Sequence, residues 1–194
     1  IYDTFGASNM QVFSTSGTYT KSTGINQVMV RLVGGGGGGS GHCESGGAAG
    51  FSEKIINVSG VTSVSVVIGT GGTGTYYSGR SGPGSSISFG SFMSATGGDC
   101  ANQSYQHAGG IGGIGAGGDV NMYGGGGSAH GQVNGAGGYS FFGGCAARGH
   151  PRGGDYSRNH MRRSAPGSGG ANGWFSSYLG PEGMHGICVI WEFK

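Results

Sequence analysis

The chain has 194 residues, of which 51 are glycine and 9% are charged, and its formal net charge is +2. Average proteins contain about 7% glycine and about 25% charged residues. The length fits one domain with a modest core, while the low charge excludes a charged disordered tail and gives no indication of nucleic-acid binding. The apolar run at 187–191 is too short to span a membrane. The start at Ile1 predicts a processed product or a fragment of a longer protein.

Period-two alternation of apolar residues predicts three half-buried β-strands. They are residues 26–33, with Val28, Val30 and Leu32 on one face, 61–68, with Val64, Val66 and Ile68 on one face, and 187–193, with Ile187, Val189, Trp191 and Phe193 on one face. Weaker strand candidates are 10–14, 51–58 and 86–93, and no segment has the periodicity of a confident α-helix. We expect both ends of the chain to feed one sheet that anchors the domain.

Glycine runs separate these segments, at 34–39, 46–50, 69–74, 109–118, 124–127, 135–138, 143–149 and 167–173. They lack the strict Gly-X-Y period of collagen. A flexible linker is the simplest interpretation of such runs. The runs are, however, short and evenly distributed, they alternate with aromatic residues such as Tyr123 and Trp174, and they are flanked by strands that need a folded body to pack on. We therefore predict that the glycine runs are folded.

The folded alternative is a lattice of polyglycine-II helices, which share the three residues per turn of polyproline II and have no internal hydrogen bonds. Their N–H and C=O groups point sideways and need partners, which neighbouring helices can supply because glycine lets backbones approach closely. We predict a mainly β and irregular fold in which short strands anchor this lattice, with little or no α-helix. The single domain 1–194 would comprise an N-terminal anchor at 1–33, the lattice with its loops at 34–185, and a closing strand at 186–194.

Such a lattice presents side chains mainly at its turns, so we expect function to reside there. The candidate segments are Thr73–Pro83, Asp99–Ala108, Asp119–Tyr123, Ser128–Asn134, Arg148–Pro166 and Ala171–Pro181. Their Tyr, Ser, Asn, His and Arg residues are typical of antibody-like binding surfaces. Segment 148–163 holds five of the ten Lys and Arg residues, and all five are Arg. Arginine suits bidentate contacts to carboxylate or phosphate, so this segment predicts contact with an acidic surface; a solvated loop is the alternative.

No residue pattern indicates catalysis or metal binding. His42, Cys43 and Glu44 are three metal-ligand types in a row, but adjacent residues rarely converge on one ion. Segment 71–82 lacks the Gly-Lys-Ser/Thr ending of a phosphate loop. We therefore expect no enzyme activity, no cofactor and no metal. We also favour reduced thiols over disulfides for the four widely spaced cysteines, Cys43, Cys100, Cys145 and Cys188.

Several sequence blocks in a fixed order resemble the glycine-rich C-terminal tip domain of tailed-bacteriophage tail fibres. The blocks are VMVRLVGGGGGGSG at 28–41, GGAAGFSEKIINVSGVTSVSVVIGTGG at 46–72, GPGSSISFGSFMSATGG at 82–98, GGIGGIGAGGDVNMYGGGG at 109–127, GGYSFFGG at 137–144 and GICVIWEF at 186–193. The chain is also similar in style to the separate glycine-rich adhesins that cap the long tail fibres of T-even-like phages. It lacks their recognisable attachment domain, which favours a tip fused to its fibre.

The resemblance implies a non-enzymatic receptor-binding tip, or adhesin, made in the host cytoplasm and carried at the distal end of a virion tail fibre. It implies that the receptor is an outer-membrane protein or lipopolysaccharide of a Gram-negative host. The further partners it implies are the rest of the tail fibre and other copies of the chain in a homotrimer. It implies neither nucleic-acid binding nor membrane insertion. The predicted receptor-binding residues are Tyr76, Tyr77, Arg80, Tyr105, His107, Met122, Tyr123, His130, Arg152, Tyr156, Arg158, His160, Arg162, Arg163, Trp174 and Tyr178. An ice-binding or structural polyproline-II bundle is the alternative function.

Overall fold

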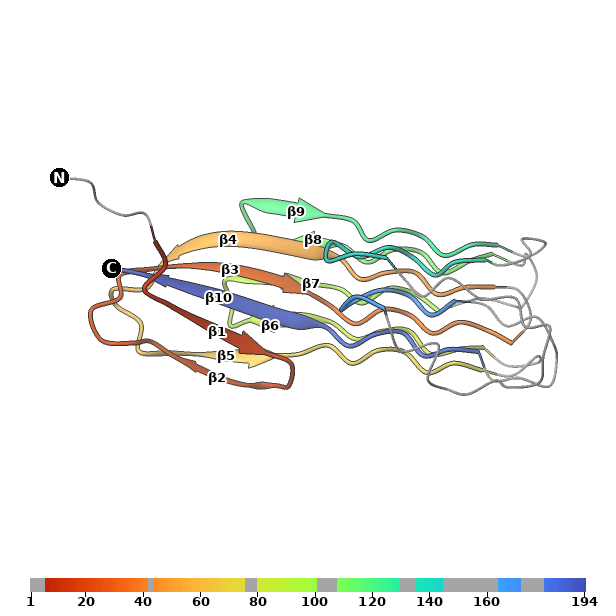
Figure 1. The fold of residues 1–194 in the computed structure, drawn as a ribbon, viewed down its shortest axis with the longest axis horizontal. Coiled ribbons are helices and arrows are strands. Elements are labelled where there is room, and N and C mark those ends of the chain that lie inside the picture. Colours follow the sequence, from red (N-terminus) through yellow and green to blue (C-terminus); the bar gives the residue numbers. More distant parts are fainter. Residues whose placement is uncertain are drawn as a thin grey trace.

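The structure is a computed structural model that describes residues 6–41, 44–75, 80–100, 108–129, 135–144, 164–171 and 180–194. Strands gather at one end of the molecule, and glycine runs extend side by side from them (Figure 1). The described residues contain no helix, and the predicted mainly β and irregular fold is confirmed. The strands are β1 (Asn9–Phe13), β2 (Gly17–Thr20), β3 (Gln27–Val33), β4 (Phe51–Asn57), β5 (Ser63–Val67), β6 (Ile87–Phe89), β7 (Met93–Ala95), β8 (Gly115–Ala116), β9 (Val120–Met122) and β10 (Ile187–Phe193).

The strands form two five-stranded antiparallel sheets that enclose a hydrophobic core. The first sheet has the order β1-β10-β3-β4-β9, and the second has the order β2-β5-β6-β7-β8. β1 pairs with β10 along its whole length, which confirms that both ends of the chain feed one sheet. The predicted apolar faces of β3 and β5 meet in the core, where Val28, Val30, Leu32, Val64 and Val66 are all buried.

Two details differ from the sequence pattern. Segment 86–93 is not one strand, because Gly90 turns the chain with a positive φ of 51° between β6 and β7. In β10 the alternating residues from Ile187 to Phe193 form the outer face, and the opposite face, which contains Cys188, Ile190 and Glu192, is fully buried. The sequence pattern instead predicts that the face from Ile187 to Phe193 is the buried one, because a glutamate such as Glu192 is rarely found in a core.

Glu192 is this buried carboxylate, and hydrogen bonds from four residues hold it, the longest of them from the Gln11 side-chain amide to Oε1 at 3.5 Å. Its Oε1 accepts from the Tyr19 hydroxyl at 2.7 Å and from the Ser22 amide at 3.1 Å, and its Oε2 accepts from the Ser22 hydroxyl at 2.7 Å and the Asn9 side-chain amide at 2.9 Å. Burial alone raises the pKa of Glu192, but the bonds from Ser22, Tyr19 and Asn9 outweigh burial and lower this pKa to about 2. The carboxylate therefore ties β10 to β1, to β2 and to the turn that follows β2.

We expect Glu192→Gln to lower the free energy of unfolding at pH 7 by about 2–4 kcal/mol, because a glutamine N–H group would face donors that need an acceptor. The wild-type pKa is depressed, so the stabilisation is complete above the ordinary value of 4.5 and is lost as the pH falls towards 2. Denaturant unfolding between pH 7 and pH 2 should therefore show a steeper loss of stability in the wild type than in the variant. Parallel profiles would contradict this assignment.

Hydrogen bonds between the glycine runs repeat every three residues. Consecutive residues from Gly34 to Ser40 donate in turn to three neighbouring runs, and every third residue returns to the same neighbour. The donor–acceptor pairs are Gly34–Gly50 and Gly37–Gly47, Gly35–Ser85 and Gly38–Gly82, and Gly36–Met184 and Gly39–Pro181. Acceptor numbers fall as donor numbers rise, so these three neighbours are antiparallel to run 34–41. The three-residue repeat is that of polyglycine II.

The runs are stacked in three layers. Run 34–41 accepts hydrogen bonds from three further runs, so it is surrounded by six neighbours, and run 44–50 is bonded to six neighbours in the same way. Every residue of these two runs that the structure describes is buried. The hydrogen bonds place runs 69–75, 34–41, 44–50 and 124–129 in the middle layer, runs 80–85, 96–100 and 108–114 in one outer layer, and runs 135–139, 167–171 and 180–186 in the other.

Glycine is required at many inward positions, because a neighbouring backbone occupies the place where a side chain would lie. A Cβ atom on Gly37 would lie 1.9 Å from the Asp99 carbonyl oxygen. A small shift cannot relieve this overlap, because the oxygen belongs to the backbone and not to a flexible side chain. Outward positions carry side chains instead, as at Ile111 and Ile114, which are exposed and three residues apart. Gly126 also faces outward, because the nearest atom to its Cβ position is the Gly110 oxygen at 3.6 Å.

This difference predicts opposite outcomes for two alanine substitutions. Gly37→Ala should destabilise the domain by about 3 kcal/mol or more, because the methyl group forces two runs apart. Gly126→Ala should change the stability by less than about 1 kcal/mol, because its methyl group meets ordinary contacts. Thermal melting followed by circular dichroism measures both variants. Equal losses of stability would contradict the lattice geometry.

Candidate functional site at the far end of the lattice

The far end of the lattice is the end opposite the strands (Figure 1). There the Ser40 amide donates to the Glu44 carbonyl at 2.9 Å, where the two central runs meet. The amides of Gly41 and Gly180 both donate to the Thr75 carbonyl, at 2.9 Å and 2.8 Å. These bonds join the ends of four runs and define the part of the far-end surface that the structure describes.

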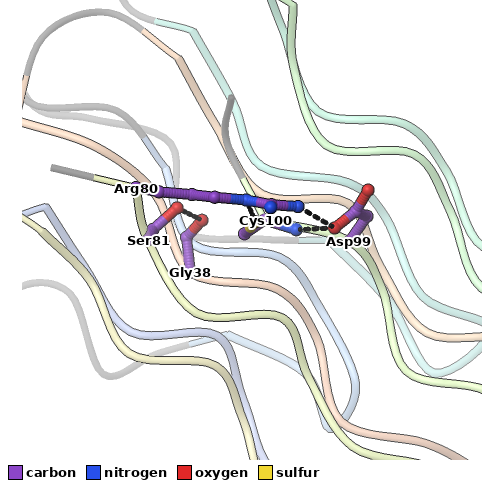
Figure 2. Close-up of polar contacts among 5 residues, drawn as sticks. All are labelled: Gly38, Arg80, Ser81, Asp99 and Cys100. Carbon is purple, nitrogen blue, oxygen red and sulfur yellow. Dashed lines mark hydrogen bonds and ion pairs between the residues drawn. The ribbon is translucent and has the colours of Figure 1, made fainter. Parts of the chain in front are cut away.

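Arg80 lies on this surface, where Asp99 and Cys100 hold it (Figure 2). Its Nη2 is 3.9 Å from Asp99 Oδ1, and its Nε donates to Cys100 Sγ at 3.2 Å. The Cys100 amide donates to the same Asp99 oxygen at 2.8 Å. The next residue, Ser81, donates its hydroxyl to the Gly38 carbonyl at 2.8 Å and so fixes this segment to the central run. We name Arg80, Asp99 and Cys100 the Arg80 cluster.

The thiol of Cys100 is a neutral partner in this cluster. Burial raises the pKa of Cys100, and the hydrogen bond from Arg80 opposes that rise only in part. The charge of Arg80 is therefore compensated by Asp99 rather than by a thiolate. In β10, burial raises the pKa of Cys188 to about 12. Both cysteines are free, as predicted for them, while Cys43 and Cys145 lie outside the described residues.

Exposure distinguishes Arg80 from Glu44 and Ser81, two polar residues of the same lattice. Glu44 is fully buried, and its Oε2 accepts from the Ser40 hydroxyl at 2.6 Å. Ser81 is buried as well. The Arg80 side chain, in contrast, is 63% exposed. Glu44 and Ser81 are therefore enclosed by the lattice, whereas the Arg80 guanidinium is accessible to solvent.

The residues that flank the arginine-rich segment 148–163 lie away from the far end of the lattice. The Ala165 amide donates to the Gly144 carbonyl at 3.2 Å, so the two sides of the segment meet there. Phe141 and Phe142 lie close by in the sequence, and the Phe141 ring stacks on Phe51, the first residue of β4, with 3.6 Å between ring centroids. The flanks therefore lie at the junction of sheets and lattice, and not at the far end.

The prediction that segment 119–123 is a turn is wrong. Val120–Met122 form β9 and pair with Phe51–Glu53 of β4. The strand forms because the edge of β4 offers partners to this backbone. Met122 and Tyr123 are exposed, but β9 lies at the strand end of the molecule (Figure 1), so the structure does not bring them together with Arg80.

The remaining predicted receptor-binding residues lie outside the described residues. They are Tyr76, Tyr77, Tyr105, His107, His130, Arg152, Tyr156, Arg158, His160, Arg162, Arg163, Trp174 and Tyr178. Sequence reasoning selected Arg80 but missed its partnership with Asp99 and Cys100. The sequence spacing of these three residues does not predict their contact, because the contact arises where runs 80–85 and 96–100 pack side by side in one layer.

The sheets and the lattice together correspond to one known type of domain. The model of a glycine-rich domain family matches residues 12–191. The chain belongs to this family. The match runs from β1 to β10, so the strand end and the lattice are parts of the same glycine-rich domain. No curated protein shows a significant match to the sequence.

The described residues contain no group of three or more His, Cys, Asp or Glu side chains that could hold a metal ion. Among the same residues, no helix is long and apolar enough to cross a membrane. The exposed guanidinium of Arg80 can form bidentate hydrogen bonds to an acidic group.

The two buried thiols should react slowly in the native domain, because the attacking species is the thiolate and burial disfavours it. In a Cys43→Ser, Cys145→Ser background at pH 8, we expect Cys100 and Cys188 to react at least about 100-fold more slowly in the native than in the unfolded chain. Mass spectrometry after timed alkylation measures each site. Rapid native labelling of Cys100 would contradict its place in the Arg80 cluster.

Proposed function

We propose that this glycine-rich domain is the receptor-binding tip of a bacteriophage tail fibre, carried in the virion at the distal end of the fibre. It recognises an outer-membrane protein or lipopolysaccharide of a Gram-negative host and performs no covalent chemistry. The observation that carries the proposal is the separation of the two ends of the molecule. β1 and β10 lie at the strand end (Figure 1), and the exposed cation of Arg80 lies at the far end.

The lattice supports this proposal because it is suited to hold a contact surface away from its attachment. Run 34–41 is bonded to six neighbouring runs, so bending it requires several hydrogen bonds to break together. Polyproline-II geometry rises about 3.1 Å per residue, so this run of eight residues extends about 25 Å. The strand end is left for the other partners that the proposal includes, the rest of the fibre and further copies in a homotrimer.

Arg80 supports an acidic group as the feature recognised on the receptor. Phosphates of lipopolysaccharide and carboxylates of protein loops both accept paired hydrogen bonds from a guanidinium. Because Cys100 and Asp99 already restrict the side chain, binding costs less conformational entropy than it would for a free arginine. A pre-positioned cation of this kind serves recognition more directly than catalysis.

The proposal predicts that the immobilised domain captures a receptor from outer-membrane extracts of a susceptible Gram-negative host. Arg80→Ala should weaken this capture about 5- to 10-fold, as expected for loss of one charge-assisted contact. Surface plasmon resonance against the captured receptor measures the affinity.

Lys54→Ala is the matched control, because Lys54 is a cation of β4 at the strand end, where its ammonium donates to the Gly117 carbonyl at 2.8 Å. This variant should bind as the wild type does. If no host tested yields a captured receptor, the proposed function is wrong. If Arg80→Ala and Lys54→Ala lower the receptor affinity equally, Arg80 is not part of the contact.

Ice binding or a purely structural role is the second candidate, and one observation favours it. Thr70 and Thr73 are exposed and three residues apart on an edge run, and Ile111 and Ile114 repeat this spacing on an outer layer. The lattice therefore presents regular outward rows. Thermal hysteresis in the absence of receptor capture would select ice binding.

A further inference from the structure

One side of the lattice is formed by two neighbouring runs, 108–114 and 124–129, and carries exposed apolar side chains. Ile111 and Tyr123 are 73% and 75% exposed, and Ile114 is 47% exposed. Residues three apart in a three-residue repeat point in the same direction, so Ile111 and Ile114 form an outward row. Side chains of this size prevent a further glycine run from approaching as closely as the inner runs approach one another, so the lattice ends at this side.

Hydrogen bonds between the two runs set a fixed register. The paired residues are Gly127 and Gly110, Gly124 and Gly113, and Tyr123 and Ile114. This antiparallel register places Gly126 opposite Ile111 and Ala129 opposite Ala108. The nearest atom to the Cβ position of Gly126 is the Gly110 oxygen at 3.6 Å, so the row of Gly126 faces the side on which run 108–114 lies. We name these two rows the Gly126 facet, which contains Ala108, Ile111, Ile114, Tyr123, Gly126 and Ala129.

Gly126 leaves a gap in the side chains of this facet. Tyr123 and Ala129 precede and follow it by three residues, which is about 9 Å along the run in either direction. Gly126 is exposed and does not have a positive φ. The gap therefore has room for one side chain of a partner, with the apolar groups of Ile111 and Tyr123 as its neighbours.

Three backbone amides of the two runs have no acceptor within the part of the chain that the structure describes. They belong to Gly109, Gly112 and Gly126. Their neighbours Gly110 and Gly127, in contrast, donate to other runs at 2.8 Å. Unpaired amides at the edge of a hydrogen-bonded array are suited to the carbonyls of an extended chain that adds to this edge.

The facet carries no charged side chain, and it adjoins the Arg80 cluster. The Asp99 amide donates to the Ile111 carbonyl at 2.8 Å, so the row of Ile111 and Ile114 lies next to run 96–100. Aliphatic side chains offer no hydrogen bond to the hydroxyl groups of a sugar, whereas they stabilise an apolar side chain by burial. The chemistry of the facet therefore complements a polypeptide better than a glycan.

We propose that the Gly126 facet binds an extended apolar segment of an outer-membrane protein. One apolar side chain of this segment lies in the gap at Gly126, and main-chain carbonyls accept from the amides of Gly112 and Gly126. The inference rests on the proposed function, from which it takes the receptor, and it selects protein over lipopolysaccharide for this contact. Because Arg80 lies in the same layer as run 108–114, one receptor can cover the facet and present an acidic group to Arg80.

Two matched glycine variants test the proposal. Gly126→Leu fills the gap, and Gly60→Leu makes the same change at an exposed glycine outside the lattice, where no atom lies within 4 Å of the Cβ position. Neither glycine has a positive φ, so both variants should melt as cooperatively as the wild type. The probe is solubilised outer-membrane protein of a susceptible host, freed from lipopolysaccharide. We expect Gly126→Leu to lower the affinity at least about 10-fold by biolayer interferometry and Gly60→Leu to leave it unchanged.

The outcomes separate this inference from the proposed function. Wild-type affinity in Gly126→Leu would overturn the facet and leave the receptor-binding function standing, whereas capture of neither outer-membrane protein nor lipopolysaccharide by the wild type would overturn both. Purified lipopolysaccharide of the same host is the second probe, and its binding at a site that Gly126→Leu blocks would overturn the choice of a polypeptide. A multimer of the wild type that Gly126→Leu dissociates in light scattering would assign the facet to a second copy and overturn the proposal as well.

Hydrogen exchange followed by mass spectrometry gives a measurement that needs no variant. The amides of Gly112 and Gly126 have no acceptor among the described residues, so peptides that span 108–114 and 124–129 should gain protection when the wild type binds the outer-membrane protein. Peptides of the opposite edge run 69–75 should exchange as they do in the free domain. A complex without added protection in 108–114 and 124–129 would place the contact elsewhere and overturn the proposal.

Discussion

The backbone hydrogen bond between neighbouring glycine runs is the interaction on which the rest of the molecule depends. From Gly34 to Ser40, every third amide donates to the same neighbouring run, so one run can join several others without any side chain. This arrangement satisfies buried N–H and C=O groups that would otherwise carry a desolvation penalty. It also requires glycine at positions such as Gly37, where a Cβ atom would lie 1.9 Å from the Asp99 carbonyl oxygen. The high glycine content is thus a packing requirement of this core.

Side chains are consequently concentrated where the lattice ends. At the strand end, Val28 and Leu32 belong to a hydrophobic core of the ordinary kind, and Glu192 ties the last strand to the first two. At the far end, Arg80 and Asp99 lie on the surface. The two ends therefore differ in chemistry, with a hydrophobic core at one and an exposed cation at the other.

Local periodicity accounts for what could be predicted from the sequence. The alternation in 26–33 identifies β3 and its buried face, and glycine runs between strands indicate a lattice. The neighbours of each run cannot be predicted in this way, because any run could accept bonds from any other. For the same reason the sequence gives no sign that Ser22 meets Glu192, that 120–122 adds to β4, or that Arg80 meets Cys100. Those contacts follow from the arrangement of distant segments.

The three-residue repeat has a consequence for insertions and deletions. Adding one residue inside run 44–50 would rotate every later residue by about 120°, so Gly47 and Gly50, which donate to Asp99 and Thr96, would no longer both face run 96–100. Adding three residues would restore the phase and only lengthen the rod. Within a glycine run, only insertions or deletions of three residues, or of a multiple of three, keep the hydrogen-bond pattern. Insertions and deletions of any other length are accommodated only outside the runs.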